Sequence, residues 1–182
     1  MFSEEELIQK CIDNDGRAQK EFYQRFAPKM YGVCLRFTKN RMEADDILQE
    51  GFVKVFLNLK SFRREGSLEG WIRRTVVNTA INLFKKNAKH QKDLDIDTAD
   101  IRGHHQDPGI IDKLSVEELL GLINKLPTGY RMVFNLNVME GYTHKEISEL
   151  LGISENTSKS QLSRARQTLQ KKLAGLQYNN NE

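Results

Sequence analysis

Residues 143–173, THKEISELLGISENTSKSQLSRARQTLQKKL, decide how the C-terminal part of the chain folds, because their spacing predicts two helices joined by a tight turn. Thr143 and Glu146 have the spacing of a capping box, in which each side chain satisfies a free amide of the first turn. Gly152 stands where that helix must end in a left-handed residue. Ser154 can cap a second helix only two residues later. The stretch therefore predicts a helix-turn-helix.

The second helix of this unit has one apolar face and one cationic face. Its apolar residues recur every three or four positions: Leu162, Ala165, Leu169, Leu173 and Leu176. Residues 157–173 include five basic residues and no acidic one. A helix with one buried face, and with small polar and cationic side chains on the other, suits a DNA major groove. The alternative, a solvated helix that merely carries charge, does not explain the tight turn.

Composition and charge favour an all-α protein of two small helical domains. Hydrophobic residues make up 38% of the 182 residues, there are only three prolines, and alternating β-branched runs are scarce. Lys and Arg outnumber Asp and Glu by 17 to 12 in residues 1–90 and by 9 to 7 in residues 113–182, but the ratio is 2 to 6 in residues 91–112. We therefore expect domains over 1–89 and 113–182, joined by a flexible acidic linker over 90–112, with nucleic-acid contacts at both ends.

Helical spacing and caps predict further helices over residues 3–14, 17–39, 42–62, 68–89, 115–126 and 127–140, with a kink or restart at Pro28. Cys11 and Cys34 are expected to be buried free thiols, which fits a reducing cytoplasm, and a redox switch is the alternative. No segment reaches the roughly 18–20 apolar residues of a membrane span, and the acidic N-terminus is unlike a signal peptide. His104, His105 and His144 are expected to be solvated, so we predict no metal site and no cofactor.

The helix expected over residues 68–89 has an exposed face with the chemistry of unpaired bases. One face must be core: Ile72, Val76, Thr79, Ala80 and Leu83. The other face forms a stripe of an aromatic, two amides and two cations: Trp71, Arg74, Asn78, Asn82 and Lys85. An indole can stack on a base, amides can bond base edges, and cations can hold phosphates. The alternative is that Trp71 packs against the preceding helices and that the asparagines are ordinary surface residues.

Three segments occur in the order ADDILQEGFVKVF (44–56), SLEGWIRRTVVNTAINLFKK (67–86) and, after the acidic linker, a helix-turn-helix that contains KSQLSRAR (159–166). This order resembles bacterial RNA polymerase sigma factors, in particular the two-domain extracytoplasmic-function (ECF) group of the sigma-70 family. The resemblance covers about residues 5–175. It implies that residues 1–89 are sigma region 2 and that residues 113–182 are sigma region 4.

By this resemblance, the first segment binds the clamp helices of the largest subunit of core RNA polymerase. The implied contacts are Asp46, Gln49, Glu50 and Phe52. Together with Asp45, the carboxylates of Asp46 and Glu50 give one helix face a negative patch for a basic partner. A role in complementing the helix dipole explains Asp45 and Asp46, but it does not explain Glu50 one turn later.

The resemblance assigns DNA contacts to both helical domains. The stripe from Trp71 to Lys85, with the loop over residues 62–67, captures the promoter −10 element and a flipped base. Primary sigma factors carry two adjacent aromatic residues where this chain has Gly70 and Trp71, so we expect a weaker wedge and stricter promoter choice. For the −35 element, the implied base contacts are Lys159, Ser160, Ser163 and Arg164, and the implied phosphate contacts are Arg166 and Lys171.

Two positions depart from the pattern of the family. Ser158 stands on the buried side of the second helix, where valine is usual, and we expect looser packing of the two helices there. Gln161 replaces a common arginine, which predicts a changed affinity or base preference.

The resemblance therefore implies a transcription initiation factor, not an enzyme, that binds core RNA polymerase and promoter DNA and melts the DNA by trapping unstacked bases. It also implies an anti-sigma factor as partner, a cytoplasmic location that this partner can shift to the membrane, no homo-oligomer, and a linker that occupies the RNA channel of the polymerase. A dimeric helix-turn-helix regulator of duplex DNA is the alternative, but it leaves the Trp71 stripe and the DDILQE segment without a role. A nucleic-acid-modifying enzyme would need a catalytic constellation, and residues 1–110 have none.

Overall fold

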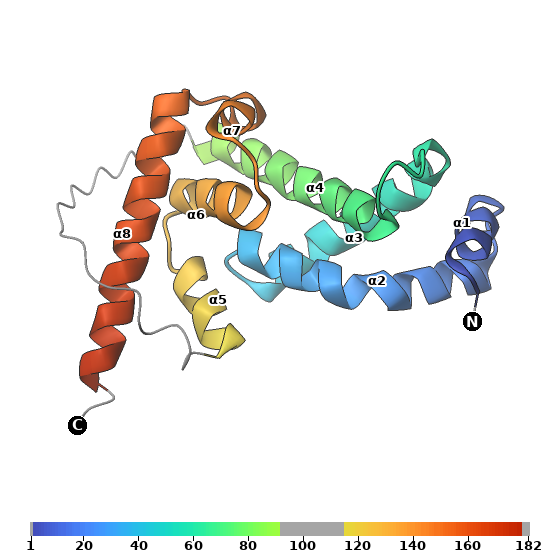
Figure 1. Cartoon of the computed structure of the whole chain (residues 1–182), viewed down its shortest axis with the longest axis horizontal. Helices are drawn as coiled ribbons and strands as arrows, with labels where there is room; N and C mark the ends of the chain where they lie inside the picture. Colours follow the sequence, from blue (N-terminus) through green and yellow to red (C-terminus); the bar gives the residue numbers. More distant parts are fainter. Residues whose placement is uncertain (1, 92–114, 180–182) are drawn as a thin grey trace. The chain divides into compact units, whose positions relative to one another are not determined.

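The computed structural model describes residues 2–91 and 115–179, and both ranges are helical, which confirms the all-α prediction (Figure 1). The first range contains α1 (Glu4–Ile12), α2 (Gly16–Phe37), α3 (Arg41–Asn58), the 3-10 turn η1 (Leu59–Ser61) and α4 (Leu68–Gln91). The second contains α5 (Val116–Asn124), α6 (Thr128–Phe134), the π-helical turn η3 (Asn135–Met139), α7 (His144–Leu151) and α8 (Glu155–Asn179). The chain forms two compact units, of which the first ends at Lys86. Most of the expected linker, with His104 and His105, lies outside the described residues.

Side-chain caps begin the helices where the sequence predicts them. The three expected capping boxes form, at the starts of α1, α5 and α7. In the first two boxes, the backbone amide of the capping serine donates to the glutamate and holds the pKa of that carboxyl, Glu6 or Glu118, below its usual range. Asp15 caps α2 by accepting hydrogen bonds from the amides of Ala18 and Arg17, which lower its pKa as well. Capping side chains thus fix where these helices start.

Pro28 lies inside α2, and the helix runs through it from Gly16 to Phe37. Of the two expected outcomes at this proline, a restart was therefore wrong, and a kink stays a prediction. A proline inside a helix costs about 3 kcal/mol, because it removes one backbone hydrogen bond and crowds the preceding turn. Phe22, Phe26 and Met30 are buried on one face of the same helix. Each such side chain contributes about 1.5–3 kcal/mol on burial, so the packing of this face outweighs the cost of the proline.

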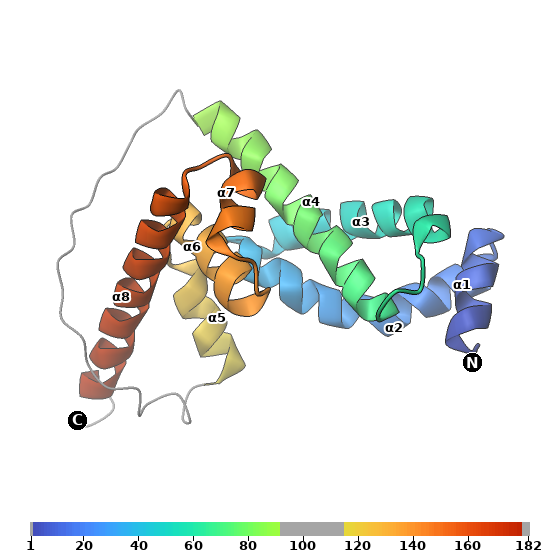
Figure 2. The same cartoon turned by 45° about the horizontal axis from the view of Figure 1, so that its top comes forward.

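The core of the first unit is built around phenylalanines of α2 and α3, which lie side by side (Figure 2). The ring of Phe22 lies 4.9 Å from that of Phe26 in its own helix. It also lies 6.5 Å from the ring of Phe52 and 5.4 Å from that of Phe56, both in α3. Tilted and edge-on pairs at these distances add to the free energy gained from buried area alone.

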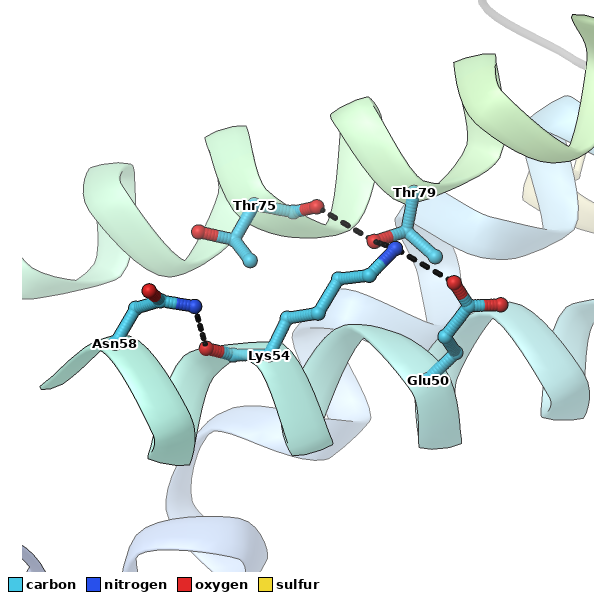
Figure 3. A network of polar contacts seen from close by, with 5 residues as sticks. All are labelled: Glu50, Lys54, Asn58, Thr75 and Thr79. Atoms are coloured by element: carbon cyan, nitrogen blue, oxygen red, sulfur yellow. Dashed lines mark hydrogen bonds and ion pairs between the residues drawn. The ribbon is translucent and has the colours of Figure 1, made fainter.

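The helix α4 lies against α3 at a position where α3 has no side chain. A Cβ atom at Gly51 would lie only 3.1 Å from Cγ2 of Val76 in α4. One turn later, the ammonium of Lys54 lies 2.6 Å from Glu50 and donates to the hydroxyl of Thr79 at 3.4 Å, as Figure 3 shows. The hydroxyl of Thr79 itself donates to the carbonyl of Thr75. Close backbone approach and one bridging lysine therefore join the two helices.

The second unit packs α6 and α7 against α8. Arg131 of α6 is only 2% exposed and donates to the carbonyl of Asn124 at the end of α5. Gly152 ends α7 with φ of 69°, as predicted, and the hydroxyl of Ser154 accepts a hydrogen bond from the amide of Thr157 in the first turn of α8. The predicted helix-turn-helix is confirmed, and α8 continues to Asn179.

Ser158 is completely buried where α7 meets α8, and its hydroxyl lies 2.8 Å from Nδ1 of His144. His144 is therefore half-buried and bonded, whereas the sequence suggested an exposed residue. The hydrogen bond joins the first turns of the two helices. A buried hydroxyl needs such a partner, and the expectation of looser packing at Ser158 did not take His144 into account.

Cys11 and Cys34 are buried free thiols, as expected. Burial raises the pKa of Cys11 to about 11 and that of Cys34 to about 12. Both groups therefore stay protonated at neutral pH, and a protonated thiol is a poor nucleophile. Every helix in the described parts of the chain is too short or too polar to cross a membrane.

We predict that Gly51→Leu lowers the stability of the first unit by about 1–3 kcal/mol, because the added side chain must displace Val76. The matched variant Gly32→Leu should be neutral or stabilising, since a Cβ atom at Gly32 meets nothing within 4 Å. Urea unfolding followed by the fluorescence of Trp71, the single tryptophan, reports on this unit. Equal midpoints for the two variants would show that α3 and α4 do not approach closely.

We predict that Ser158→Ala weakens the attachment of α7 to α8 by about 1 kcal/mol, because His144 loses its partner. Hydrogen exchange of the amides of α7 should then become about fivefold faster. The exposed Ser163 offers a matched control, and Ser163→Ala should leave this exchange unchanged. Unchanged protection of α7 in Ser158→Ala would mean that the hydrogen bond contributes nothing.

Candidate nucleic-acid and protein interfaces

The outer face of α3 presents three of the four residues expected to contact the polymerase. Asp46, Gln49 and Glu50 are exposed. Phe52 is not, because it is only 2% exposed and its ring lies 4.8 Å from that of Tyr23. Its assignment as a contact is corrected on this ground: Phe52 supports α3 from beneath. Helical spacing alone does not show which face of α3 Phe52 occupies, because that depends on where α2 packs.

Three large apolar side chains on the outer face of α3 were missed by the sequence analysis. Met42, Val53 and Leu57 are 73%, 57% and 76% exposed. With Asp46 and Gln49 they recur every three or four residues and form one stripe along the helix. Exposed apolar residues in line with polar ones mark protein interaction surfaces. A helical wheel of residues 42–58 by itself would have found this stripe.

The negative patch on α3 is weaker than the sequence suggested. The carboxylate of Glu50 is paired with Lys54 at 2.6 Å, one turn further along the same helix (Figure 3). Both groups of this pair are partly exposed, at 58% and 35%, so the pair contributes little to stability. Asp45 and Asp46, both exposed, carry the rest of the negative charge of this face.

The outer face of α4 presents the stripe that the sequence predicts. Four of its five members are exposed: Arg74, Asn78, Asn82 and Lys85. The opposite face is core, and Ile72, Val76 and Thr79 are at most 1% exposed. Trp71 matches neither of its two alternatives fully, which were an exposed residue that stacks on a base and a residue packed against the preceding helices. It is half-buried, with its ring 5.6 Å from that of Phe62 in the preceding loop.

The loop before α4 is held by its backbone and by one ion pair. Arg64 and Gly66 both have left-handed backbones, with φ of 60° and 102°. The guanidinium of Arg64 lies 3.0 Å from Glu5 of α1. The hydroxyl of Ser67 accepts a hydrogen bond from the amide of Gly70 and so caps α4. These contacts place Phe62 beside Trp71, and the two rings form one aromatic surface.

The outer face of α8 is polar and cationic from its first turn onward. All six residues expected to contact DNA are exposed: Lys159, Ser160, Ser163, Arg164, Arg166 and Lys171. Three of the six have partners within the protein, and the hydroxyl of Ser160 donates to the carbonyl of Thr157 in the same helix at 2.9 Å. Lys159 lies 3.8 Å from Glu155, and the guanidinium of Arg164 donates to the hydroxyl of Tyr130 in α6 at 3.3 Å. No sequence pattern pointed to Tyr130, because its pairing with Arg164 depends on how α6 packs on α8.

Gln161 does not belong to this outer face. A Cβ atom at Gly129 of α6 would lie 3.2 Å from the side-chain amide of Gln161. Gln161 therefore fills the contact between α6 and α8. The expected effect of Gln161 on base preference would have to act through this contact.

The described residues offer binding surfaces and no metal-binding chemistry: no group of three or more His, Cys, Asp and Glu side chains between residues 2 and 91 or 115 and 179 could hold a metal ion. The surfaces on α3 and α4 both lie in the first unit, and the surface on α8 lies in the second. Stacking, hydrogen bonding to base edges and phosphate binding are what these side chains can do.

Comparison with known proteins identifies both units. The family model for sigma-70 region 2 matches residues 22–90, and the model for sigma-70 region 4 matches residues 116–169. The chain is 29% identical over 180 residues to the ECF RNA polymerase sigma factor SigW of Bacillus subtilis, covering 93% of this chain and 96% of SigW. It is 26% identical over 183 residues to the RNA polymerase sigma-H factor of Pseudomonas aeruginosa, covering 95% of each.

A solved structure supports the fold. The sigma factor RpoE of Bartonella quintana, crystallised in complex with the anti-sigma factor NepR, is similar with a TM-score of 0.52 and 21% identity, over 86% of this chain and 96% of RpoE. The two family models, in the order expected from the sequence, confirm the resemblance that its motifs carry. The chain belongs to the ECF group of the sigma-70 family, whose members are non-catalytic subunits that bind core RNA polymerase and direct it to promoters.

Proposed function

We propose that this sigma factor divides promoter recognition among three surfaces: α3 binds core RNA polymerase, α4 captures the single-stranded −10 element, and α8 reads the −35 duplex. The observation that carries the proposal is the outer face of α4. There, Trp71 is held beside Phe62, and two amides and two cations follow it along the helix. This combination fits unpaired bases better than it fits duplex DNA, because stacking needs an exposed base face.

The polymerase contact uses the stripe on the outer face of α3. Asp46, Gln49 and Glu50 supply polar contacts to a basic surface, and Val53 and Leu57 supply the apolar area that Phe52 cannot. Charged groups mainly set the choice of partner and the rate of association. Burial of the apolar area of Val53 and Leu57 on docking adds to the affinity. Charged groups that select the partner, together with apolar area that adds affinity, suit a subunit that must bind one site on a large enzyme.

Melting uses binding energy alone. A base that leaves the duplex can stack on Trp71, while Asn78 and Asn82 bond its edges and those of its neighbours. Arg74 and Lys85 hold the phosphates on either side. Since these contacts are possible only when bases are unpaired, they stabilise the open state relative to the duplex. Catalysis then belongs to the polymerase.

Duplex recognition uses the N-terminal half of α8. Lys159, Ser160, Ser163 and Arg164 face the base edges of the major groove, and Arg166 and Lys171 hold phosphates on its sides. Tyr130 helps here, because its hydroxyl holds the guanidinium of Arg164 before DNA arrives. A side chain that is ordered in advance loses less conformational entropy on binding.

The proposal assigns sigma region 2 to residues 1–89, the linker to residues 90–112 and sigma region 4 to residues 113–182. Four linker aspartates, Asp93, Asp95, Asp97 and Asp100, suit the basic channel of the polymerase that later holds RNA. We further propose that the protein works in the cytoplasm as a monomer and is restrained by an anti-sigma factor, as RpoE is bound by NepR in the solved complex.

We predict that the double change Asp46→Lys and Glu50→Lys lowers the affinity for purified core RNA polymerase by about a hundredfold or more, because it places cations against a basic surface. Asp13→Lys at the end of α1, which makes the same kind of charge reversal outside this face, should bind normally. Fluorescence anisotropy of labelled protein gives the affinity, and circular dichroism checks that helical content is kept. Binding of the double variant at wild-type strength would remove the polymerase contact from this face.

We predict that Trp71→Ala and Asn78→Ala impair open complexes more than closed complexes. Trp71→Phe should retain part of the activity, because a phenyl ring still stacks on a base. Permanganate reactivity of thymines near the start site measures melting, and a gel shift on the same promoter measures closed-complex binding. Unchanged thymine reactivity in both alanine variants would refute the melting role of α4.

We predict different effects for two changes on α8. Arg164→Ala should cost about 1–3 kcal/mol and relax the preference at one or two −35 positions. Lys171→Ala should weaken binding to all sequences alike and reduce the salt slope by about one phosphate contact. Tyr130→Phe should resemble a mild Arg164→Ala. Duplexes with single base changes, titrated at several salt concentrations, distinguish these cases, and identical behaviour of Arg164→Ala and Lys171→Ala would contradict the orientation of α8.

A further inference from the structure

A surface pocket of about 410 Å³ lies between α2 and α3 in the first unit, and neither the DNA-binding faces nor the core accounts for it. Its walls are mainly apolar: Tyr23, Ala27, Pro28, Tyr31 and Leu48. The ring of Tyr23 is held in place by an edge-on contact with Phe52 at 4.8 Å, yet the residue remains 38% exposed. The pocket is therefore a fixed feature that is open to a partner.

The charged group at this pocket is a carboxylate, whereas the amide of Gln24 and the tyrosine hydroxyls can both donate and accept hydrogen bonds. The carboxylate of Asp45 belongs to its lining, and so does Gln24.

These features favour one class of side chain as the occupant of the pocket, which we call the guest. An apolar stem fits the walls, a cation meets the carboxylate of Asp45, and two tyrosine rings favour a cation further. A purely apolar side chain would cover the carboxylate without supplying a donor, which costs free energy. An anionic guest would meet the carboxylate with the wrong sign. Lysine and arginine have the required combination of a long stem and a cationic end with several donors.

The position of the pocket indicates which protein supplies the guest. Asp45 lines the pocket and is followed directly by Asp46, and Gln49 lies one turn further along α3. The pocket is thus continuous with the face proposed to bind the polymerase. We propose that it receives a lysine or arginine side chain of core RNA polymerase when that enzyme docks on α3. The inference rests on the proposed function and adds an anchor site to it.

Affinity for purified bacterial core RNA polymerase tests the pocket in the full-length protein. Asp45→Asn keeps the shape of an exposed side chain and should weaken binding about tenfold, as should Tyr31→Leu. Because both changes act on the same guest, the double variant should be much less than a hundredfold weaker. Circular dichroism establishes that each variant is folded. Wild-type affinity of Asp45→Asn overturns the proposal whatever Tyr31→Leu does.

The chemistry of the guest is tested by cross-linking. A benzoyl-phenylalanine at the exposed position 24, on the wall of the pocket, should cross-link core RNA polymerase at a peptide that contains a lysine or arginine. Changing that basic residue to methionine in the polymerase should weaken binding to the wild-type protein about tenfold and should make Asp45→Asn silent. A cross-link to a peptide without a basic residue, or no cross-link in an assembled holoenzyme, overturns the proposal.

The double variant Asp46→Lys and Glu50→Lys distinguishes failure of the docking face on α3 from failure of the pocket. If it fails to bind core polymerase while Asp45→Asn and Tyr31→Leu bind normally, α3 is the docking face and the pocket is not its anchor. If all of these variants bind like wild type, both the docking face and the pocket are wrong.

Discussion

The contact of α3 with α4 is the constraint on which the first unit depends. Gly51 lets the backbone of α3 approach Val76 closely, and Lys54 connects the carboxylate of Glu50 to the hydroxyl of Thr79 in α4. Each helix gives one face to this contact and to the core, so the opposite faces stay free. The outer face of α3 is then available to the polymerase and that of α4 to DNA. Any distortion of one helix is felt by the other, because close-packed helices do not deform independently.

The second unit also fixes the orientation of its helices, but with fewer buried apolar residues among those described. The two helices of its helix-turn-helix are joined by a turn that Gly152 and Ser154 define, and a hydrogen bond between His144 and Ser158 connects their first turns. Tyr130 then orients the guanidinium of Arg164 from the neighbouring α6. Polar pairs that are satisfied within the protein thus set the geometry of the surface proposed to bind DNA.

The sequence predicted local features well because their causes are local. Capping boxes, the left-handed Gly152 and the two faces of α4 follow from residues within a few positions of one another, and the structure confirms them. The assignments of surface residues rest partly on the family resemblance, which the region 2 and region 4 matches support. Fold class and membership of the family could therefore be predicted from the sequence.

The errors came where a neighbouring helix decides the outcome. Phe52 stands at a spacing compatible with either face of α3, and only the position of Tyr23 in α2 shows that it is buried. Val53 and Leu57 were overlooked for a different reason, since a helical wheel of α3 alone shows that they share a face with Asp46 and Gln49. Pro28 should disrupt a helix by local rules, but the aromatic face of α2 outweighs it. Ser158 looked like a packing defect because its partner, His144, lies fourteen residues away across a turn.

Mapping of transcription start sites in vitro tests the central claim most directly, because it requires polymerase binding, promoter choice and melting at once. Core RNA polymerase with this protein would transcribe fragmented genomic DNA of the source bacterium, and the 5′ ends of the RNA would be compared with those made by core enzyme alone. Our account predicts new 5′ ends that share two upstream sequence elements, near −10 and −35, at a fixed spacing. Start sites identical to those of core enzyme alone, although the protein binds duplex DNA, would contradict it and would indicate a regulator that is not a polymerase subunit.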